Sequence, residues 1–291
     1  MTRRLALAVS GGARSSRPTR LSLALRRPPE RLAPEQEPRH NHRMSKRLSA
    51  VLLTFICALS GMAQDSESSS AFYEQKRPAN FEGIGKFYLG REISHVMGHL
   101  GADWLERDSR ESEERPDELV RMLDVQPGSV IADIGAGTGY FSRRLAKATG
   151  AEGVVLAVDL QPEMLTLLRE NMHEAGLDNV VPILGDVDDP KLLGQSVDLV
   201  LMVDVYHEFE FPHEMMTRIV DSLSDEGIVA FVEYRAEDPE VPIKRLHKMT
   251  EAQVIKEAEF VGLEHWRTLG SLPRQHVILC RKASASDSNK E

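Results

Sequence analysis

Apolar and polar positions alternate regularly along the second half of the chain. After the turn at Gln126-Pro127-Gly128, short apolar runs alternate with stretches in which apolar residues recur every three or four positions. The short runs predict strands at 129–133, 154–159, 180–184, 197–203, 227–234, 264–269 and 276–281. The periodic stretches predict helices at 140–149, 162–175, 212–223 and 250–261. Strands that alternate with helices favour a parallel sheet covered on both faces, so we expect a doubly wound α/β domain over 127–282.

The segment before this domain predicts a linker followed by helices. Residues 64–80 are rich in Ser and Glu and indicate a flexible linker, and 81–126 carry helical signals. We interpret 81–115 as a lid over a ligand crevice, with a solvated charged helix as the alternative. Apolar contacts from this lid are expected from Phe87, Tyr88 and Trp104. Ion pairs that hold it are expected from Arg110, Glu114 and Arg115.

The first 63 residues are typical of a targeting segment. Residues 1–43 are rich in Arg, Pro and Ser, and we interpret them as a non-native upstream extension or a basic leader. Residues 44–63 join a basic start to a short apolar run and end in Gly61-Met62-Ala63, which predicts a secretory signal peptide and a periplasmic or secreted protein. The run is short for a membrane span. An organellar transit peptide and a disordered basic tail, with an organellar or cytoplasmic protein, are the alternatives, and 283–291 predict a disordered tail.

Charge and cysteine content exclude two classes of protein. The chain has 36 Lys and Arg against 45 Asp and Glu, and 12 of the basic residues but only 3 of the acidic ones lie in 1–63. The remainder is therefore strongly acidic and repels polyanions, which argues against nucleic-acid binding through a broad basic surface. A disulfide scaffold is excluded because there are only two cysteines, Cys57 and Cys280.

A glycine-rich loop joins the first predicted strand to the following helix. The sequence from Asp133 to Gly139 reads Asp-Ile-Gly-Ala-Gly-Thr-Gly, and glycines at such a turn let backbone approach a ligand closely. The helix that follows offers free N–H groups and the positive end of its dipole. A dinucleotide site has the spacing G-x-G-x-x-G, whereas Tyr140 occupies the position of that third glycine here. A P-loop is excluded because no Gly-Lys-Ser/Thr follows.

Three acidic residues follow strand ends near this loop. Asp133, Asp159 and Asp186 come at the carboxyl ends of the first three predicted strands, which meet at one edge of a parallel sheet. Three carboxylates would disfavour an anionic ligand. They suit a ligand that carries an ammonium group, a ribose and an adenine, since carboxylates accept hydrogen bonds from all three.

These motifs resemble the class I S-adenosylmethionine-dependent methyltransferases over about residues 110–282. The loop matches that family's acidic-x-G-x-G-x-G pattern, and the groups most similar are the type 11 and quinone-biosynthesis small-molecule methyltransferases. The resemblance implies S-adenosylmethionine as cofactor and seven strands in the order 3-2-1-4-5-7-6, the last strand antiparallel. It implies cofactor contacts at Asp133, Gly135, Ala136, Gly137, Thr138, Gly139, Asp159, Leu160, Asp186, Val187 and Asp204.

The segment after the fourth predicted strand carries the candidate catalytic residues. Methyl transfer is an in-line displacement at a sulfonium carbon, so the protein positions both reactants and removes a proton where the acceptor has one. His207 is the candidate base, with local capping as the alternative, and Glu208 is expected to orient it or to bind a cationic acceptor. Tyr206 is expected either to line the methyl site or to pack in the core.

Two further groups of residues are weaker candidates. His95 and His99 have a spacing that suits one helical face, but no third ligand is evident and we predict no metal site. An acidic acceptor is expected to be attracted by Arg235, Lys244, Arg245 and His247, unless these residues are ordinary surface charge.

Three functions remain open from the sequence. The leading one is a methyltransferase that acts on a small molecule. The second is an exported, non-catalytic nucleoside-binding module, and the third is a nicotinamide-dependent oxidoreductase, which the loop spacing disfavours. The acceptor and the oligomeric state are not readable, since one fold serves many acceptors.

Overall fold

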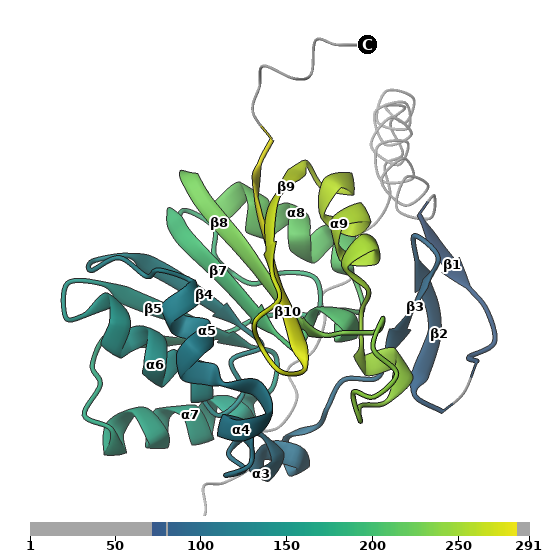
Figure 1. Ribbon diagram of the computed structural model, residues 1–291. Coiled ribbons are helices and arrows are strands. Elements are labelled where there is room, and N and C mark those ends of the chain that lie inside the picture. Colours follow the sequence, from purple (N-terminus) through teal and green to yellow (C-terminus); the bar gives the residue numbers. More distant parts are fainter. Residues whose placement is uncertain (1–71, 80, 284–291) are drawn as a thin grey trace, which may run out of the picture. The chain divides into compact units, whose positions relative to one another are not determined.

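The computed structural model describes residues 72–79 and 81–283 (Figure 1). The predicted upstream extension, the signal peptide, most of the predicted linker and residues 284–291 lie outside the described residues.

A seven-stranded sheet forms the centre of the described chain. Its strands are β4 (Val130–Ile134), β5 (Val154–Asp159), β6 (Val180–Leu184), β7 (Val197–Val203), β8 (Leu223–Tyr234), β9 (Leu263–Leu269) and β10 (Gln275–Lys282). They lie in the order β6-β5-β4-β7-β8-β10-β9. β10 runs antiparallel to both of its neighbours, β8 and β9, and all other pairs in this sheet are parallel. The predicted doubly wound, mostly parallel sheet and its strand order are confirmed.

Helices cover both faces of this sheet because successive strand residues are apolar on both sides. Ile131, Val155 and Leu201 point to one face, where α5 (Pro116–Met122) and α6 (Tyr140–Thr149) pack, with α7 (Pro162–Glu174) beside them. Val200, Met202 and Phe231 point to the other face, toward α8 (Pro212–Ser222) and α9 (Glu251–Phe260). Cys280 is completely buried on this second face. Figure 1 shows the two helical layers on either side of the sheet.

The carboxyl ends of the parallel strands create the place for a site. β4, β5, β6 and β7 all end at the same edge, and each is followed by a loop rather than directly by a helix. The strand order changes direction between β4 and β7, and this leaves a crevice at the edge. Such a crevice is the usual ligand position in sheets of this kind.

The N-terminal part differs from the expected helical lead-in. β1 (Tyr73–Gln75), β2 (Gly83–Tyr88) and β3 (Arg91–Ser94) form a separate antiparallel sheet in the order β1-β2-β3. The predictions of helix over this stretch and of linker at 73–75 are therefore wrong. Gly85 and Gly90 have positive φ angles, of 75° and 97°, which a bulge and a tight turn accept and a helix does not. The helical signals of 81–126 are confirmed only from Ala102 onward.

One arginine attaches this small sheet to the main domain. Arg91 donates two hydrogen bonds to the carboxylate of Glu257 on α9, at 2.7 and 2.9 Å. Its third nitrogen donates to the backbone carbonyl of His207 at 3.1 Å. The Glu257 side chain is fully buried. Burial acts to lower the pKa of Arg91, but the charge of Glu257, its hydrogen bonds and the charge of Glu233 together raise that pKa. This bidentate pair fixes the hairpin against the loop that follows β7.

Two short helices continue from the hairpin across the sheet edge. They are α3 (Ala102–Leu105) and α4 (Arg110–Glu114), which precede α5. Arg110 and Glu114 form the expected ion pair, with Nε 2.6 Å from the carboxylate, and both side chains are buried. Arg115 instead pairs with Glu118 at the surface. In the part of the chain that the structure describes, no helix has the length and apolar character that crossing a membrane requires.

Candidate functional site

The glycine loop takes a backbone shape that other residues would disturb. Gly135, Gly137 and Gly139 have φ angles of 72°, 54° and 82°. A Cβ atom on Gly135 would lie 2.4 Å from Val205, and one on Gly137 would lie 2.6 Å from Leu105. The loop therefore presents bare backbone at the sheet edge, where α6 begins directly after Gly139. We call this bare stretch of backbone the glycine cradle; a side chain at Gly135 or Gly137 would collide with Val205 or Leu105.

Asp159 connects this loop to the end of β5. One carboxylate oxygen accepts the Gly137 N–H at 2.9 Å, and the other accepts the Gln161 N–H at 2.8 Å. Burial raises the pKa of Asp159 above its ordinary value, while these backbone donors oppose the rise. The carboxylate has lone pairs left for a ligand hydroxyl, which is what the predicted ribose contact requires.

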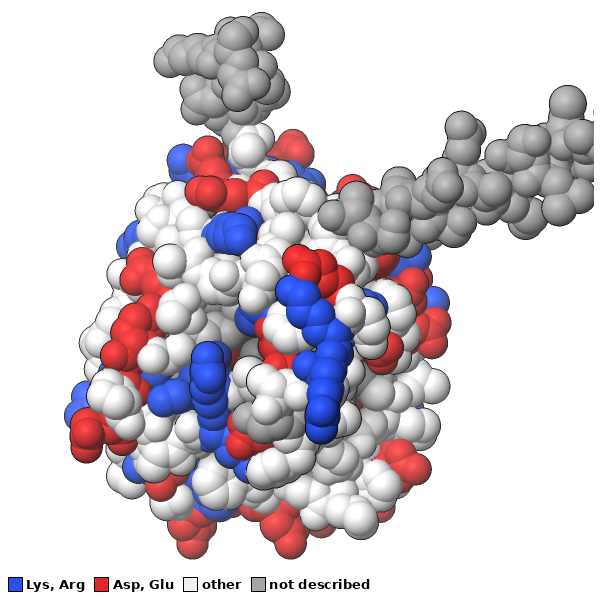
Figure 2. Space-filling view, turned by 90° about the vertical axis from the view of Figure 1, so that its right-hand side faces the viewer, with Lys and Arg blue, Asp and Glu red and all other residues white. Residues whose placement is uncertain are grey.

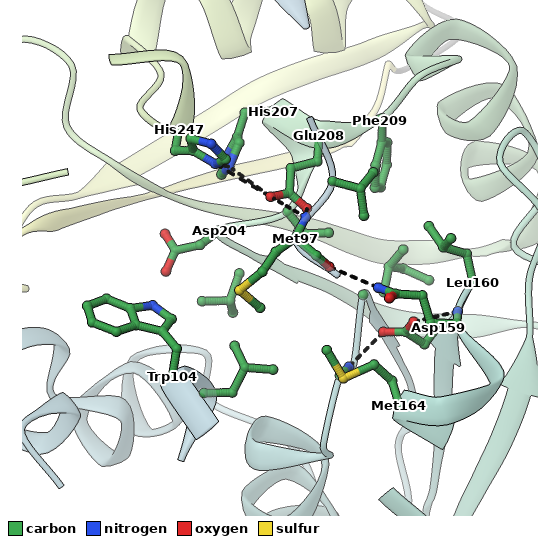
Figure 3. A pocket seen from close by; sticks show the side chains of 18 of the residues that line it. Met97, Trp104, Asp159, Leu160, Met164, Asp204, His207, Glu208, Phe209 and His247 are labelled. Atoms are coloured by element: carbon green, nitrogen blue, oxygen red, sulfur yellow. Dashed lines mark hydrogen bonds and ion pairs between the residues drawn. The ribbon is translucent and has the colours of Figure 1, made fainter. Parts of the chain in front are cut away.

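A cavity of about 670 Å³ opens beside the loop and Asp159. Most of the predicted site residues line it: Trp104, Gly135, Gly137, Asp159, Leu160, Asp186, Val187, Asp204, His207 and Glu208. Figure 3 shows Asp159, Leu160 and Met164 together on one side and His207 with His247 on another. The cavity therefore has two ends, which we call the cofactor end (at Asp159) and the acceptor end (at His207).

Asp204 lines the cavity and has one unpaired oxygen. Its Oδ2 accepts a hydrogen bond from Gln275 at 2.7 Å, whereas the buried Oδ1 finds no partner among the described residues. Burial, followed by the charges of Glu114 and Glu233, raises the pKa of Asp204 well above its ordinary value. A buried polar atom of this kind needs a partner. Together with the glycine cradle and the apolar side chains of Leu160 and Val187, it fits an amphipathic nucleoside ligand.

Other predicted loop residues lie behind the cavity wall. Ala136 and Asp133 line a small adjoining hollow, and the Ser142 hydroxyl donates to Asp133 at 2.6 Å. Burial raises the pKa of Asp133 to about 6. The Thr138 hydroxyl donates to Glu106, and the Gly139 N–H donates to the Ala136 carbonyl. These residues shape the loop, which leaves direct ligand contact to Gly135 and Gly137.

Three predicted substrate residues do not reach the cavity. Tyr88 is completely buried in an aromatic cluster with Phe72 and Tyr73. Tyr206 is also buried, with its ring against Phe231. The Arg235 guanidinium donates its hydrogen bonds to the backbone carbonyls of residues 272, 273 and 275. For Tyr206 the predicted alternative, packing in the core, is confirmed. The predictions that Tyr88 and Arg235 line the site are wrong, because Tyr88 packs among aromatic rings and Arg235 binds backbone carbonyls.

His207 occupies the acceptor end with a carboxylate behind it. It lies in a short 3₁₀ turn after β7, η3 (Tyr206–Glu208), and its Nδ1 is 2.6 Å from Oε2 of Glu233 at the end of β8. Burial alone would lower the pKa of His207, but the charge and hydrogen bond of Glu233 and the charge of Glu208 together raise that pKa. The carboxylate holds the proton on Nδ1, so Nε2 of the neutral ring carries a lone pair.

Nε2 of His207 faces two further polar side chains. It lies 3.2 Å from Nδ1 of His247, which belongs to the turn η4 (Arg245–His247), and 3.9 Å from Oε1 of Glu208. The Glu208 carboxylate accepts the Met97 N–H at 3.2 Å to each oxygen. Figure 3 shows the carboxylate of Glu208 turned toward the two imidazoles. We call His207, Glu208 and His247 the histidine cluster.

Sequence reasoning missed Glu233 and Met97 and gave His247 a different role. Glu233 had a signal, since it is a single acid in the otherwise apolar end of a buried strand, and such acids need a buried partner. Met97 had none, because it acts through its backbone N–H. His95 is exposed and outside any helix, and His99 starts a 3₁₀ turn, so the two do not share a helical face.

Buried ion pairs build a part of the cavity wall that adjoins the glycine loop. Glu114 pairs with Arg110 and Arg107, and it also accepts the Tyr234 hydroxyl at 2.6 Å. Arg107 stacks over the Trp104 ring, with 3.8 Å between its guanidinium carbon and the ring centroid. α3 and α4 are thus fixed to β8, and Trp104 lines the cavity as predicted for a lid residue.

The sheet order, the glycine loop and the acid at the end of β5 define the class I methyltransferase fold. Residues 126–272 match a family described as a methyltransferase domain, which is half of the chain, and the chain belongs to this family. The solved structure of a SAM-dependent methyltransferase from Aquifex aeolicus is 20% identical, with a TM-score of 0.60, and covers 64% of this chain and 98% of that one. The chain therefore contains a methyltransferase domain, and its fold is that of the solved S-adenosylmethionine-dependent methyltransferase.

Matches to individual relatives are shorter. A protein-L-isoaspartate O-methyltransferase of Aeropyrum pernix is 39% identical over 66 residues, which are 23% of this chain and 25% of the relative. A tRNA (guanine(37)-N(1))-methyltransferase of Pyrococcus abyssi is 28% identical over 165 residues, 52% of this chain and 47% of the relative. The chain thus spans less than half of either relative, and the two relatives act on different acceptors.

Proposed function

We propose that the protein transfers the methyl group of S-adenosylmethionine to a small molecule through an oxygen or sulfur atom that first loses a proton. The observation that carries this proposal is the division of the cavity. Its cofactor end has the bare glycine loop and Asp159, and its acceptor end has His207 with Glu233 behind it. Methyl transfer to such an atom needs a positioned donor and a group that activates the acceptor, and the two ends supply these.

The size and the surroundings of the cavity favour a small acceptor. A volume of about 670 Å³ falls within the roughly 300–1,000 Å³ of small-molecule sites. Figure 2 shows one face of the protein, on which basic and acidic side chains are interspersed without a continuous basic surface. Such a face offers little to the phosphate backbone of a tRNA. The acceptor end also has a cation, Lys244, which favours an acceptor with negative charge.

In this proposal the chain's own residues divide the work. Gly135 and Gly137 let the donor approach the loop, Asp159 accepts from its ribose, and the unpaired Oδ1 of Asp204 meets a polar group. S-adenosylmethionine supplies the activated methyl group. Glu233 holds His207 through Nδ1, and Nε2 of His207 activates the acceptor. In the simplest form of the proposal, His207 is the base that removes the acceptor's proton, which is the role expected from the sequence.

Calorimetric titration of the full-length protein with S-adenosylmethionine and NADH tests the cofactor step. We expect binding of S-adenosylmethionine only, weakened at least about 10-fold in Asp159→Asn. Asp221→Asn removes an exposed acid on α8 and serves as the matched control. Absence of S-adenosylmethionine binding in the unchanged protein would overturn the proposal.

Formation of S-adenosylhomocysteine separates an enzyme from a binding module. The protein is incubated with S-adenosylmethionine and panels of small thiols, phenols and alcohols, and the product is quantified. We expect turnover with at least one panel and a loss of about 100-fold or more in His207→Ala. Cofactor binding without turnover on every panel would favour the exported nucleoside-binding module instead.

We further propose that residues 44–63 are cleaved as a signal peptide and that the mature protein is periplasmic or secreted. The support is the order of basic start, apolar run and small residues. Expression of the full chain followed by N-terminal sequencing is expected to give Gln64 as the first residue. A mature N-terminus upstream of residue 44 would contradict this.

A further inference from the structure

The histidine cluster has the dimensions of a metal site. The three donor atoms are Nε2 of His207, Nδ1 of His247 and Oε1 of Glu208, and their separations are 3.2, 3.5 and 3.9 Å. Ligands bound to zinc at about 2.0–2.1 Å in a tetrahedron lie ~3.4 Å apart. The cluster therefore matches one face of a coordination tetrahedron. Its three residues come from segments 40 positions apart, so no sequence spacing indicates it.

The surroundings of these three donors also suit a metal. Glu233 accepts a hydrogen bond from the Nδ1–H of His207, which leaves Nε2 free to coordinate and fixes the direction of the ring. The Met97 N–H donates to both oxygens of Glu208 and fixes that carboxylate. Outer hydrogen bonds of this kind, a carboxylate behind a histidine above all, orient metal ligands. Without a metal ion, the carboxylates of Glu208 and Glu233 and the imidazoles of His207 and His247 would face each other in a largely buried place.

The fourth position of the tetrahedron is open to the ligand cavity. All three residues line the cavity whose other end has the glycine loop and Asp159. Three protein ligands with an open position are the arrangement of a catalytic metal, whereas a structural zinc site is closed by four protein ligands. The donor set of two nitrogens and one oxygen favours zinc or another first-row transition metal, since magnesium and calcium prefer oxygen alone.

We propose that His207, Glu208 and His247 bind one divalent transition-metal ion, zinc by donor set, which holds the oxygen or sulfur of the methyl acceptor. The role of the ion, though not its binding, rests on the proposed methyl transfer. A thiol or hydroxyl that coordinates the ion releases its proton to solvent. The resulting thiolate or alkoxide attacks the methyl carbon, the bond from that carbon to the sulfonium sulfur breaks, and its electron pair stays on sulfur. His207 is then a ligand rather than the base.

Metal titration of the full-length protein tests this. The protein is treated with a chelator, dialysed, and titrated with Zn²⁺ by calorimetry and with Co²⁺ by visible absorption, where a tetrahedral site gives strong d–d bands. We expect these bands in the unchanged protein. In His247→Ala and Glu208→Gln, we expect Zn²⁺ binding to weaken about 100-fold or more and about 10-fold or more, respectively.

Controls keep other outcomes distinct. His173→Ala removes an exposed histidine on α7 and should leave the Co²⁺ spectrum unchanged. S-adenosylmethionine affinity is measured in every variant, and it should stay within about twofold because the cluster lies at the acceptor end. Equal Zn²⁺ binding in the unchanged protein and in His247→Ala, or no tetrahedral Co²⁺ spectrum, would overturn the metal site. A protein that binds metal at the cluster but not S-adenosylmethionine would refute the proposed function and leave the site standing.

Discussion

The two ends of the cavity are built in different ways. At the cofactor end, the contacts come from one strand–loop–helix unit and the end of the adjacent strand, with Gly137 and Asp159 joined by one hydrogen bond. At the acceptor end, Met97, His207, Glu233 and His247 arrive from four separate segments. The cofactor end is therefore a local property of the sequence, whereas the acceptor end exists only after the whole chain has folded.

Removal of the arginine that joins the hairpin to the acceptor end should have the largest effect. Arg91→Met leaves Glu257 buried without its partner, so we expect the free energy of unfolding to fall by about 3–5 kcal/mol. Urea denaturation of the full-length protein measures this. The double variant Arg91→Met with Glu257→Gln should regain most of the loss. If the double variant is no more stable than the single one, the buried pair is not the cause.

A change confined to the glycine loop should affect the cofactor end alone. Gly137→Ala adds a Cβ atom 2.6 Å from Leu105 in a left-handed position, and we expect S-adenosylmethionine to bind about 100-fold more weakly. Calorimetry measures the affinity, and the Co²⁺ spectrum reports on the other end, which should stay unchanged. Gly128→Ala is the control, since Gly128 also has a positive φ but open space around it. Equal affinity losses in both variants would point to general destabilisation instead.

A smaller effect is expected from the acid behind the loop, and it depends on pH. Burial raises the pKa of Asp133 to about 6, from 3.8 when exposed. Unfolding then releases a proton between roughly pH 4 and pH 6, so this carboxyl's stabilising contribution is present at low pH and is lost as the pH rises through that window. Asp133→Asn should therefore raise the free energy of unfolding at pH 7 by about 3 kcal/mol.

Thermal unfolding of both proteins from pH 4 to pH 7 measures this difference. We expect the two curves to converge at the acidic end and to separate toward neutrality, with Asp221→Asn parallel to the unchanged protein. A difference that does not depend on pH would show that Asp133 titrates normally.

The contrast between the ends also explains how far the sequence could be interpreted. The strands and helices of 127–282 were predictable because the apolar residues of each element recur with a period typical of that element. The glycine loop was predictable because its glycines are close together in the sequence. Ile84, Phe87 and Tyr88 have helical spacing, but Gly83, Gly85 and Gly90 and the pairing with β1 place them in strands. Tyr206 and Arg235 were assigned to the site by their position at the sheet edge alone, and position does not determine where a side chain points.

Cys280 has a consequence for the proposed export of the protein. Its thiol is buried in the central sheet, and burial raises its pKa to about 12, so almost none of it is thiolate near neutral pH. Since only the thiolate reacts, this sulfur is protected from oxidation in an oxidising compartment while β10 stays in place. Cleavage after Ala63 would also remove Cys57, which leaves a mature chain with a single, shielded thiol. The rate at which an added reagent alkylates Cys280 would then measure how often the sheet opens at β10.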